Sequence, residues 1–397
     1  MIQTSTLKSI SEFIRTGKTP PTHETKYFNG EIQWFTPGDL DKEKYLGKSM
    51  RSLTEASFLD KKATYFPAGT LLVACIGDIG KLGITTQDCS SNQQITGIKP
   101  NTSTDVNYLY YWFRYSKMVI QHFANNAVVP IINNGTLEKI KIPLPPLAEQ
   151  QKIASVLDAA DCLRQKDQQL IEKYNALSQS LFLEMFGDPV NNPLEWKKNE
   201  FGTFIDVLTD YHANGSYEVL KDNVELKRIK DYALMVRTTD LEHNNFNEDV
   251  VYISKHAYEY LEKSKVYGGE IIISKIGSAG KVFLMPYLDK PVSLGMNAFL
   301  LRFNNNLNNI FVYFLLTSKF GEIEIGKRIK GAVTKTIRKD ALREISIISP
   351  PIELQNQFAE RVQSIEAQKQ LAQASLKKSE ALFNCLLQRA FKGELTT

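Results

Sequence analysis

Two long stretches of the chain combine apolar residues at helical spacing with a complete lack of glycine and proline. They extend over residues 147–186 and 352–392, and each begins after a Pro-Pro pair and ends before a glycine. Proline near the first turn and glycine just past the last turn are typical boundaries of an α-helix. Each stretch is therefore predicted to form one helix, about 60 Å long.

Both predicted helices carry an apolar seam whose spacing alternates between three and four residues. The seam positions are Ile153, Val156, Ala160, Leu163, Asp167, Leu170, Tyr174, Leu177 and Leu181 in the first helix, and Phe358, Val362, Ile365, Lys369, Ala372, Leu376, Ser379, Phe383, Leu386 and Ala390 in the second. A heptad seam of this length predicts that the helices pack on each other. The alternative is that each helix lies on its own domain, but such a long helix would extend beyond a domain the size of either remaining block.

One charged residue interrupts each seam near its middle. These residues are Asp167 and Lys369. Antiparallel helices bring their centres together, so we expect the two side chains to approach each other and to set the register of the pair. The alternative is that both side chains point sideways into solvent.

The rest of the chain forms two mixed blocks with a different pattern. In residues 1–146 and 188–349, short runs of β-branched and aromatic residues are separated by Gly, Pro and Asn, which is typical of strands and turns. The predicted fold class is α+β, with two mixed α/β domains separated by two long helices, at 147–187 and 350–397, that pack as an antiparallel coiled coil.

The two halves of the chain repeat each other. GTLLVACIGDIGKLGI from Gly69 corresponds to GEIIISKIGSAGKVFL from Gly269, and PPLAEQQKIA from Pro145 corresponds to PPIELQNQFA from Pro350. Further upstream, WFTPGDL corresponds to MVRTTDL. Three matches in the same order indicate an internal duplication, so the halves are predicted to share one fold related by a pseudo-twofold repeat.

The composition indicates a folded chain without a membrane segment. Hydrophobic residues make up 43% of it, and its longest apolar runs are much shorter than the roughly 18 residues that cross a bilayer. No signal-peptide pattern begins the sequence, and none of the four cysteines forms a CxxC pair. These features predict a protein of the reducing cytoplasm.

The charge distribution limits where a polyanion could bind. The formal net charge is +4, which permits such a partner without requiring one. Acidic and basic residues balance across the two helices taken together, so the positive excess lies in the mixed blocks. If the chain binds a polyanion, the blocks are expected to bind it.

No combination of residues predicts a catalytic, metal or cofactor site. The repeated GxxGK turn, ending at Lys81 and Lys281, lacks the spacing and the following Ser or Thr of a phosphate-binding loop. The Pro-Pro pairs have no aromatic residue after them to stack a target base, and the five histidines lack HExxH spacing. Glu225 and Lys227 fit half of a nuclease motif, but such tripeptides are common. The chain is therefore predicted to bind rather than to catalyse.

Polar, loop-rich stretches of the two blocks supply candidate binding residues. Asn and Gln can form two hydrogen bonds with adenine, and Arg or Lys can bind guanine or phosphate. The strongest stretch is the basic one that ends at Arg338. For each stretch, the alternative is an ordinary solvated loop.

The sequence of residues 142–189, which contains the first Pro-Pro pair and the whole first helix, resembles the specificity (S) subunits of type I restriction–modification systems; it reads IPLPPLAEQQKIASVLDAADCLRQKDQQLIEKYNALSQSLFLEMFGDP. GEIQWFTPGDL from Gly30, SNQQITGIKP from Ser91 and the GxxGK turn are also similar to that family. SPPIELQNQFAERV resembles a second copy of the first region, except that Leu354 stands where Glu149 stands in the first copy. The resemblance extends over essentially the whole chain.

This resemblance implies two target recognition domains, each reading one half of a split, asymmetric sequence in double-stranded DNA. The predicted DNA contacts are Thr36, Lys81, Asn92, Gln93, Asn133, Asn134, Arg237, Lys281, Asn297, Lys330, Lys335 and Arg338. The helices would form a spacer that helps to dock two methyltransferase (M) subunits in a prokaryotic cytoplasm. Methylation with S-adenosylmethionine would belong to the M subunits, and ATP- and Mg²⁺-dependent cleavage to restriction (R) subunits, while this chain would bind no cofactor.

Two other functions are alternatives on the residues alone. One is a scaffold whose duplicated blocks bind proteins on a coiled-coil spacer. The other is a self-sufficient DNA-modifying enzyme, and the missing catalytic motifs argue against it.

Overall fold

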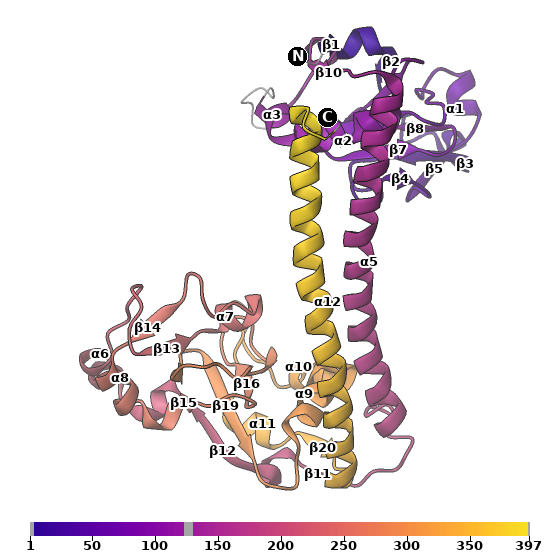
Figure 1. Cartoon of the computed structure of the whole chain (residues 1–397). Helices are drawn as coiled ribbons and strands as arrows, with labels where there is room; N and C mark the ends of the chain where they lie inside the picture. The colour runs from indigo at the N-terminus through magenta and orange to yellow at the C-terminus, as the bar shows by residue number, and fades with distance from the viewer. Residues whose placement is uncertain (1–3, 123–129, 396–397) are drawn as a thin grey trace. The chain divides into compact units, whose positions relative to one another are not determined.

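The computed structural model describes residues 4–122 and 130–395 (Figure 1). The chain divides into two compact units: unit 1 comprises Met1–Gln169 and Gln373–Thr397, and unit 2 comprises Leu170–Ala372. Residues 1–146 are called block 1 and residues 188–349 block 2. Each unit thus contains one block and half of each long helix, α5 (Leu147–Phe186) and α12 (Ile352–Lys392). These helix bounds confirm the two helices predicted from the sequence.

Block 1 is built on a five-stranded sheet of order β2-β9-β6-β7-β4, antiparallel except between β4 and β7. A three-stranded sheet, β5-β3-β8, and the pair β1-β10 complete it. The strands are β1 (Thr4–Thr6), β2 (Ser11–Thr16), β3 (Phe28–Phe35), β4 (Tyr45–Leu46), β5 (Arg51–Leu53), β6 (Leu71–Ala74), β7 (Leu82–Thr85), β8 (Cys89–Ser91), β9 (Ile95–Pro100) and β10 (Lys141–Pro143). The α-helices are α1 (Ala56–Leu59), α2 (Val106–Tyr115), α3 (Lys117–His122) and α4 (Asn134–Glu138).

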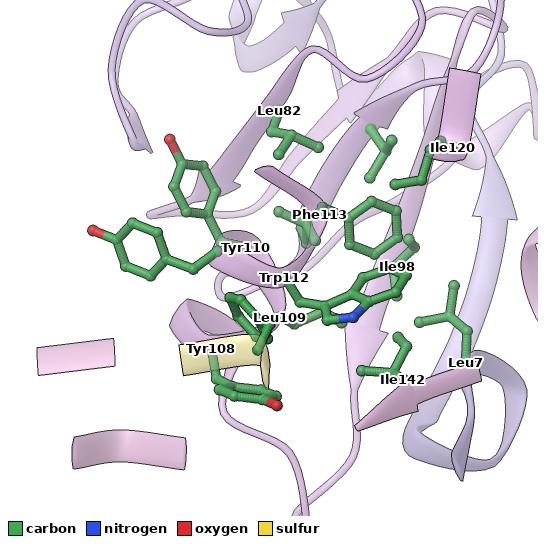
Figure 2. Close-up of a cluster of buried hydrophobic side chains, with 14 of the residues drawn as sticks. Leu7, Leu82, Ile98, Tyr108, Leu109, Tyr110, Trp112, Phe113, Ile120 and Ile142 are labelled. Carbon is green, nitrogen blue, oxygen red and sulfur yellow. The ribbon is translucent and has the colours of Figure 1, made fainter. Parts of the chain in front are cut away.

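Helix α2 lies at the centre of the core of unit 1. Its residues from Tyr108 to Phe113 are all buried, so this stretch of the helix has no polar face. Figure 2 shows Tyr108, Leu109, Tyr110, Trp112 and Phe113 in one cluster with Leu82 and Ile98 of the main sheet. The ring of Tyr108 also lies 5.3 Å from that of Phe391 in α12. A helix that is apolar all round must be covered on all sides, and α2 therefore joins the sheet to the long helices.

Block 2 contains a four-stranded antiparallel sheet, β12-β19-β16-β17, a second sheet of order β14-β13-β18-β15, and the pair β11-β20. The strands are β11 (Lys198–Glu200), β12 (Ile205–Asp210), β13 (Ala233–Val236), β14 (Val251–Ile253), β15 (Lys265–Val266), β16 (Ile271–Ser274), β17 (Val282–Leu284), β18 (Val292–Leu294), β19 (Ala298–Phe303) and β20 (Ser346–Ile348). The α-helices are α6 (Tyr217–Asn223), α7 (Thr238–His243), α8 (Lys255–Tyr260), α9 (Asn309–Thr317), α10 (Lys319–Gly326) and α11 (Lys339–Arg343).

An aromatic cluster joins block 2 to the long helices within unit 2. The ring of Phe186 in α5 lies 4.8 Å from that of Phe311 in α9 and 5.3 Å from that of Phe358 in α12. Phe182 and Phe314 extend the cluster. Because aromatic pairs contribute about 0.5–1.5 kcal/mol beyond their buried area, this cluster is a main attachment of the block.

The strand order of the two blocks confirms the predicted duplication. The order β12-β19-β16-β17 in block 2 repeats β2-β9-β6-β7 in block 1. In both blocks a parallel pair, β3–β8 or β13–β18, lies in the second sheet. The blocks differ at the sheet edge, where block 1 adds β4 beside β7.

A buried glutamine anchors the start of each long helix, just after the repeated Pro-Pro pair. Gln150 of α5 accepts a hydrogen bond from the Asp105 N–H at 2.9 Å and donates to the Pro145 carbonyl at 2.8 Å. Gln355 of α12 accepts from the Asn308 N–H at 2.9 Å and donates to Pro350 at 2.8 Å. Asp105 and Asn308 are the N-caps of α2 and α9. Each glutamine therefore fastens a long helix to the aromatic helix of its block.

The two long helices run in opposite directions, as predicted. In unit 1, the Arg164 guanidinium of α5 lies 5.9 Å from the centroid of the Phe383 ring. Asp167, later in α5, accepts a hydrogen bond from Ser379, earlier in α12. In unit 2, the end of α5 meets the start of α12 through Phe182 and Phe358. In both units, residues later in α5 thus contact residues earlier in α12, as expected for antiparallel helices.

Four of the nine predicted seam positions of α5 are exposed. Ile153 and Ala160 are buried as expected, and all predicted α12 seam positions are buried or half-buried. The row Val156, Leu163, Leu170 and Leu177 is instead 36%, 52%, 40% and 50% exposed. Buried positions one residue later include Leu157 and Ser178. The sequence pattern selected the more apolar row, whereas the structure buries positions of the adjacent row.

Candidate nucleic-acid interface

The repeated GxxGK turn has the same backbone geometry in both blocks. Its glycines all have positive φ, with values of 75° at Gly77, 86° at Gly80, 82° at Gly277 and 87° at Gly280. Glycine adopts this conformation with little strain, whereas other residues do not. The second glycine of each turn donates its N–H to the end of the preceding strand, over 3.0 Å in block 1 and 2.8 Å in block 2. The glycines are therefore required by the turn.

The lysines that end these turns have carboxylate partners. The Lys81 ammonium lies 2.7 Å from Asp78, and the Lys281 ammonium lies 3.4 Å from Glu242. Both lysines remain partly exposed. They are positioned for a polyanion but would have to share their charge with these carboxylates.

The backbone at Thr36 and Arg237 is held in the same way in the two blocks. The Thr36 N–H donates to Asp39 at 2.8 Å, and the Arg237 N–H donates to Asp240 at 2.8 Å. The Arg237 guanidinium also bonds Asp240, at 2.6 Å. This carboxylate raises the pKa of Arg237 through a side-chain hydrogen bond. Arg237 therefore stabilises the start of α7, and its role as a DNA contact remains a prediction.

The predicted amide contacts have different environments. Asn92 is 7% exposed and its amide donates to Gln94 at 2.9 Å, so it braces its own loop. Gln93 accepts a hydrogen bond from Thr19. Asn297 is exposed at a positive φ of 70°. Gln93 and Asn297 are thus the better placed of these amides to meet a ligand.

In block 1, Asn133 and Asn134 begin helix α4. Asn133 is its N-cap and accepts a hydrogen bond from the Thr136 N–H at 2.9 Å. The Asn134 oxygen accepts hydrogen bonds from Thr16 at 3.2 Å and from Thr96 at 3.1 Å. The two asparagines therefore have distinct tasks: one caps the helix and the other joins three elements.

In block 2, the predicted basic residues flank a narrow turn. Lys330 and Thr336 exchange backbone hydrogen bonds of 2.9 and 2.8 Å, and the Lys335 carbonyl accepts the Gly277 N–H at 3.2 Å. Arg338 follows at the N-cap of α11 and is exposed. The structure thus brings the GxxGK turn and the predicted basic stretch together.

Three charged residues beside this turn were not predicted. The Asp210 carboxylate, at the end of β12, accepts hydrogen bonds from Lys275 at 2.9 Å and from Lys339 at 3.0 Å. Burial opposes ionisation of this carboxyl, but the two lysine hydrogen bonds outweigh it and hold the pKa of Asp210 below its usual value. No sequence signal joins these residues, because they are 65 and 129 positions apart.

Asp167 and Lys369 each have a partner within their own unit. Asp167 accepts hydrogen bonds from Ser375 at 3.1 Å and from Ser379 at 2.8 Å. Lys369 donates to Glu366 at 2.9 Å. The serines are therefore the partners of the seam carboxylate in unit 1, and the ion pair between Asp167 and Lys369 remains a prediction.

A groove lies beside the long helices within unit 2. It has a volume of about 1680 Å³. Its walls come from α5, α9 and α12 and from the loop after β17, with Leu183, Tyr313, Val362 and Tyr287 among its lining residues. The groove is separate from the turn at Lys330 and does not contain any predicted DNA contact.

Two further features concern the whole described chain. Within residues 4–122 and 130–395, no group of three or more His, Cys, Asp or Glu side chains is arranged to hold a metal ion. Over the same residues, none of the helices has the length and apolar character needed to span a membrane.

Comparison with known proteins decides the family. A family model described as the type I restriction modification DNA specificity domain matches residues 2–173 and 206–380. The chain belongs to this family. Each match covers one block and part of the helix after it, in agreement with the duplication. The predicted resemblance to type I specificity subunits is thereby confirmed.

Individual relatives carry the same description. The type I restriction enzyme MjaIX specificity subunit of Methanocaldococcus jannaschii is 27% identical over 90% of this chain and 85% of that protein. The EcoBI specificity subunit of Escherichia coli is 21% identical over 82% of this chain and 73% of its own length. These relatives are specificity subunits, which confirms the prediction that this chain is a non-catalytic subunit.

A solved structure shares the fold of this specificity subunit. The S subunit of a type I restriction–modification system from M. genitalium matches with a TM-score of 0.60 and 16% identity, over 98% of this chain and 96% of that one. At this level of identity, the match concerns the fold. It supports the assignment of two mixed blocks with long helices.

Proposed function

We propose that this specificity subunit reads a bipartite, asymmetric sequence in double-stranded DNA, with one half-site bound by each block. The observation that carries the proposal is the shared backbone frame of the two blocks. The GxxGK turn and the start of α4 or α11 lie together in each block, at the ends of equivalent strands. The side chains at this end differ between the blocks, so the two half-sites should differ as well.

The basic surface of block 2 supports DNA as the ligand. Lys330 and Lys335 lie on a turn beside the GxxGK turn, and Arg338 follows at the start of α11. Lysine and arginine near one another attract the phosphate backbone, and arginine can also read guanine. In block 1, the N-cap position that corresponds to Arg338 is held by Asn133, a neutral amide, so the blocks offer different chemistry within one frame.

The exposed row of α5 supports a second role, the docking of M subunits. Val156 and Leu163 are exposed in unit 1, and Leu170 and Leu177 are exposed in unit 2. Residues seven apart lie on one face of a helix, and an exposed heptad row is suited to a helical partner. We therefore propose that M subunits pack helices against this row and supply S-adenosylmethionine chemistry, while R subunits supply ATP- and Mg²⁺-dependent cleavage.

The function can be tested with the complete chain and its M subunit. The complex would be used to select bound sequences from a randomised duplex pool, at a stated salt concentration because DNA affinity depends strongly on salt. Two separated, different half-sites are expected. Tight DNA binding without any sequence preference would contradict the proposal. A chain that associates with the M subunit but binds no DNA would favour a protein scaffold.

The docking role has its own test. Leu163→Glu should reduce co-purification with the M subunit at least tenfold, because it places a charge within an apolar contact. Lys166→Glu, three residues further along the same helix, is the matched control, because it changes charge at a polar exposed position. Both variants should fold as the parent chain does. Unchanged association of Leu163→Glu with M would show that this row is not the docking surface.

The proposed cellular setting for the assembly is a prokaryotic cytoplasm.

A further inference from the structure

The two blocks present different chemistry at one shared point of their frame. Strands β2 and β12 end at Thr16 and Asp210, and these residues pair with Thr96 and Phe299, the second residues of β9 and β19. Because the strand pairings correspond, Thr16 and Asp210 occupy equivalent positions. Thr96 and Phe299 are likewise equivalent.

Backbone hydrogen bonds extend this equivalence to two more positions. The Cys75 N–H donates to Gln94 at 2.8 Å, and the Lys275 N–H donates to Asn297 at 2.7 Å. The carbonyls of Cys75 and Lys275 then accept the N–H groups of Ile132 at 2.9 Å and Ile337 at 3.1 Å, two residues before Asn134 and Lys339 respectively. Asn134 and Lys339 are the first residues of α4 and α11. The strand-end site is therefore Thr16, Cys75, Thr96 and Asn134 in block 1, and Asp210, Lys275, Phe299 and Lys339 in block 2.

The strand-end site is neutral in block 1 and charged in block 2. In block 1, the hydroxyls of Thr16 and Thr96 both donate to the amide oxygen of Asn134. In block 2 the side chain of Asp210 is 10% exposed, whereas those of Lys275 and Lys339 are 28% and 34% exposed. One carboxylate holds two ammonium groups, which leaves a net charge of +1. Both ammonium groups also lie near the buried Phe299 ring, at 5.5 and 5.7 Å from its centroid.

Residues that differ at equivalent positions of the two blocks are expected to contact the part of DNA that differs between the two half-sites. The phosphate backbone is the same in every half-site, so residues that bind it have no reason to diverge. The GxxGK turns, with Lys81 and Lys281, are shared by both blocks and suit that common partner. The strand-end site diverges completely, and base edges are what distinguishes one half-site from the other.

We propose that Lys275 and Lys339, held in place by Asp210, are specificity-determining residues that read a guanine in the half-site of block 2. This inference rests on the proposed function. Ammonium groups only donate hydrogen bonds, and guanine presents two acceptors, N7 and O6, in the major groove. Asp210 accepts one hydrogen bond from each lysine and leaves further N–H donors on both. Its burial fixes the two lysines relative to strands β12 and β16 and to α11.

The test uses the full chain with its M subunit and selection from a randomised duplex. Lys339→Met and Lys275→Met, made separately, should each lower the preference for guanine at one position of the block 2 half-site by about 10- to 100-fold. The block 1 half-site should stay unchanged. Each single variant leaves Asp210 with one lysine partner, and thermal melting would confirm that the fold is retained.

Lys327→Met is the matched control, because Lys327 is an exposed lysine of block 2 that also has a carboxylate partner, Glu324 at 2.7 Å. It should leave the selected sequence unchanged. An even loss of affinity over all sequences in the Lys339 and Lys275 variants, with a salt slope reduced by about one, would assign these lysines to phosphate and overturn the proposal. An unchanged guanine preference would also overturn it. Failure of the parent complex to select any bipartite sequence would instead reject the proposed function.

Discussion

Block 1 and block 2 have the same strand order and the same glycine turns, yet the ends of their equivalent strands differ in charge. Asn134 joins two threonines in block 1, while Asp210 joins two lysines in block 2. A duplicated backbone has thus been kept while the side chains at one end were exchanged. This contrast suggests that the frame presents the ligand-binding end, and that the residues on it define what is bound.

The attachment of each block to the long helices shows a similar contrast. Gln150 and Gln355 make nearly identical hydrogen bonds at the start of α5 and α12, and each set of bonds is called a glutamine clip. Besides this glutamine, block 1 combines ring contacts such as Tyr108–Phe391 with an ion pair between Lys44 and Asp158, whereas block 2 uses the phenylalanine cluster around Phe358. The hydrogen-bonded clip is common to both blocks, and the surrounding contacts are not.

The largest expected effect on stability compares the attachment of block 2 to the long helices with that of block 1. Phe358→Ala should lower the free energy of unfolding by about 3–5 kcal/mol, because Phe358 is fully buried among aromatic rings. Phe383→Ala, in the other unit, should cost about 3 kcal/mol. Leu382→Ala is the control, because Leu382 is 45% exposed, and it should cost less than about 1 kcal/mol. Urea unfolding would measure all three, and a loss at Phe358 no larger than at Leu382 would contradict the role of the cluster.

The clips should behave alike in the two blocks. Gln150→Leu and Gln355→Leu should each destabilise the chain by about 2–3 kcal/mol, because each removes the glutamine partner of a buried carbonyl and of a half-buried backbone N–H. Gln151→Leu, at the exposed neighbouring position, is the matched control. Urea unfolding again provides the measurement. If one clip variant were as stable as the control, the equivalence of the clips would be wrong.

Acid should destabilise block 2 more than block 1. The pKa of Asp210 is depressed in the folded chain, so its stabilising contribution is present above the ordinary carboxyl pKa of about 3.9 and is lost as pH falls below that value. Asp210→Asn should remove this part of the pH dependence. Thermal melting between pH 5 and about pH 3 would measure it. Thr16→Val, at the equivalent position of block 1, should leave the pH dependence as in the parent, and identical pH profiles for Asp210→Asn and the parent would contradict the assignment.

The smallest effect on stability is expected at the equivalent N-cap positions of α4 and α11, which are Asn133 and Arg338. Asn133→Ala should cost about 1 kcal/mol of stability, because Asn133 caps α4. Arg338 makes no side-chain cap, so Arg338→Ala should change stability by less than about 0.5 kcal/mol. Arg338→Ala should instead weaken the free energy of DNA binding by about 1–3 kcal/mol. If Arg338 reads a base, this loss should be limited to sequences with the preferred base at one position of the half-site. Melting and DNA titration of both variants would test this, and unchanged DNA binding by Arg338→Ala would remove Arg338 from the interface.

Features encoded locally could be predicted from the sequence. The bounds of both long helices follow from Pro-Pro, the absence of breakers and a final glycine, and the GxxGK turns follow from their glycines. The seam of α5 was only half predicted, because both Val156 and Leu157 are apolar and only the docked block buries one of them. The Asp210 site was missed entirely, because its residues meet only when β12 and β16 pair on either side of β19 and α11 packs beside them.

The central claim is that each block reads one half-site, and exchanging blocks tests it most directly. A chimera would carry a second copy of residues 1–146 in place of residues 188–349, joined to α5 and α12 at their Pro-Pro and glycine boundaries. Together with the M subunit, it would be used to select sequences from a randomised duplex alongside the parent complex. The account predicts a target with two copies of the half-site that block 1 reads and no trace of the other half-site. A folded chimera that binds M and still selects the original asymmetric target would contradict it.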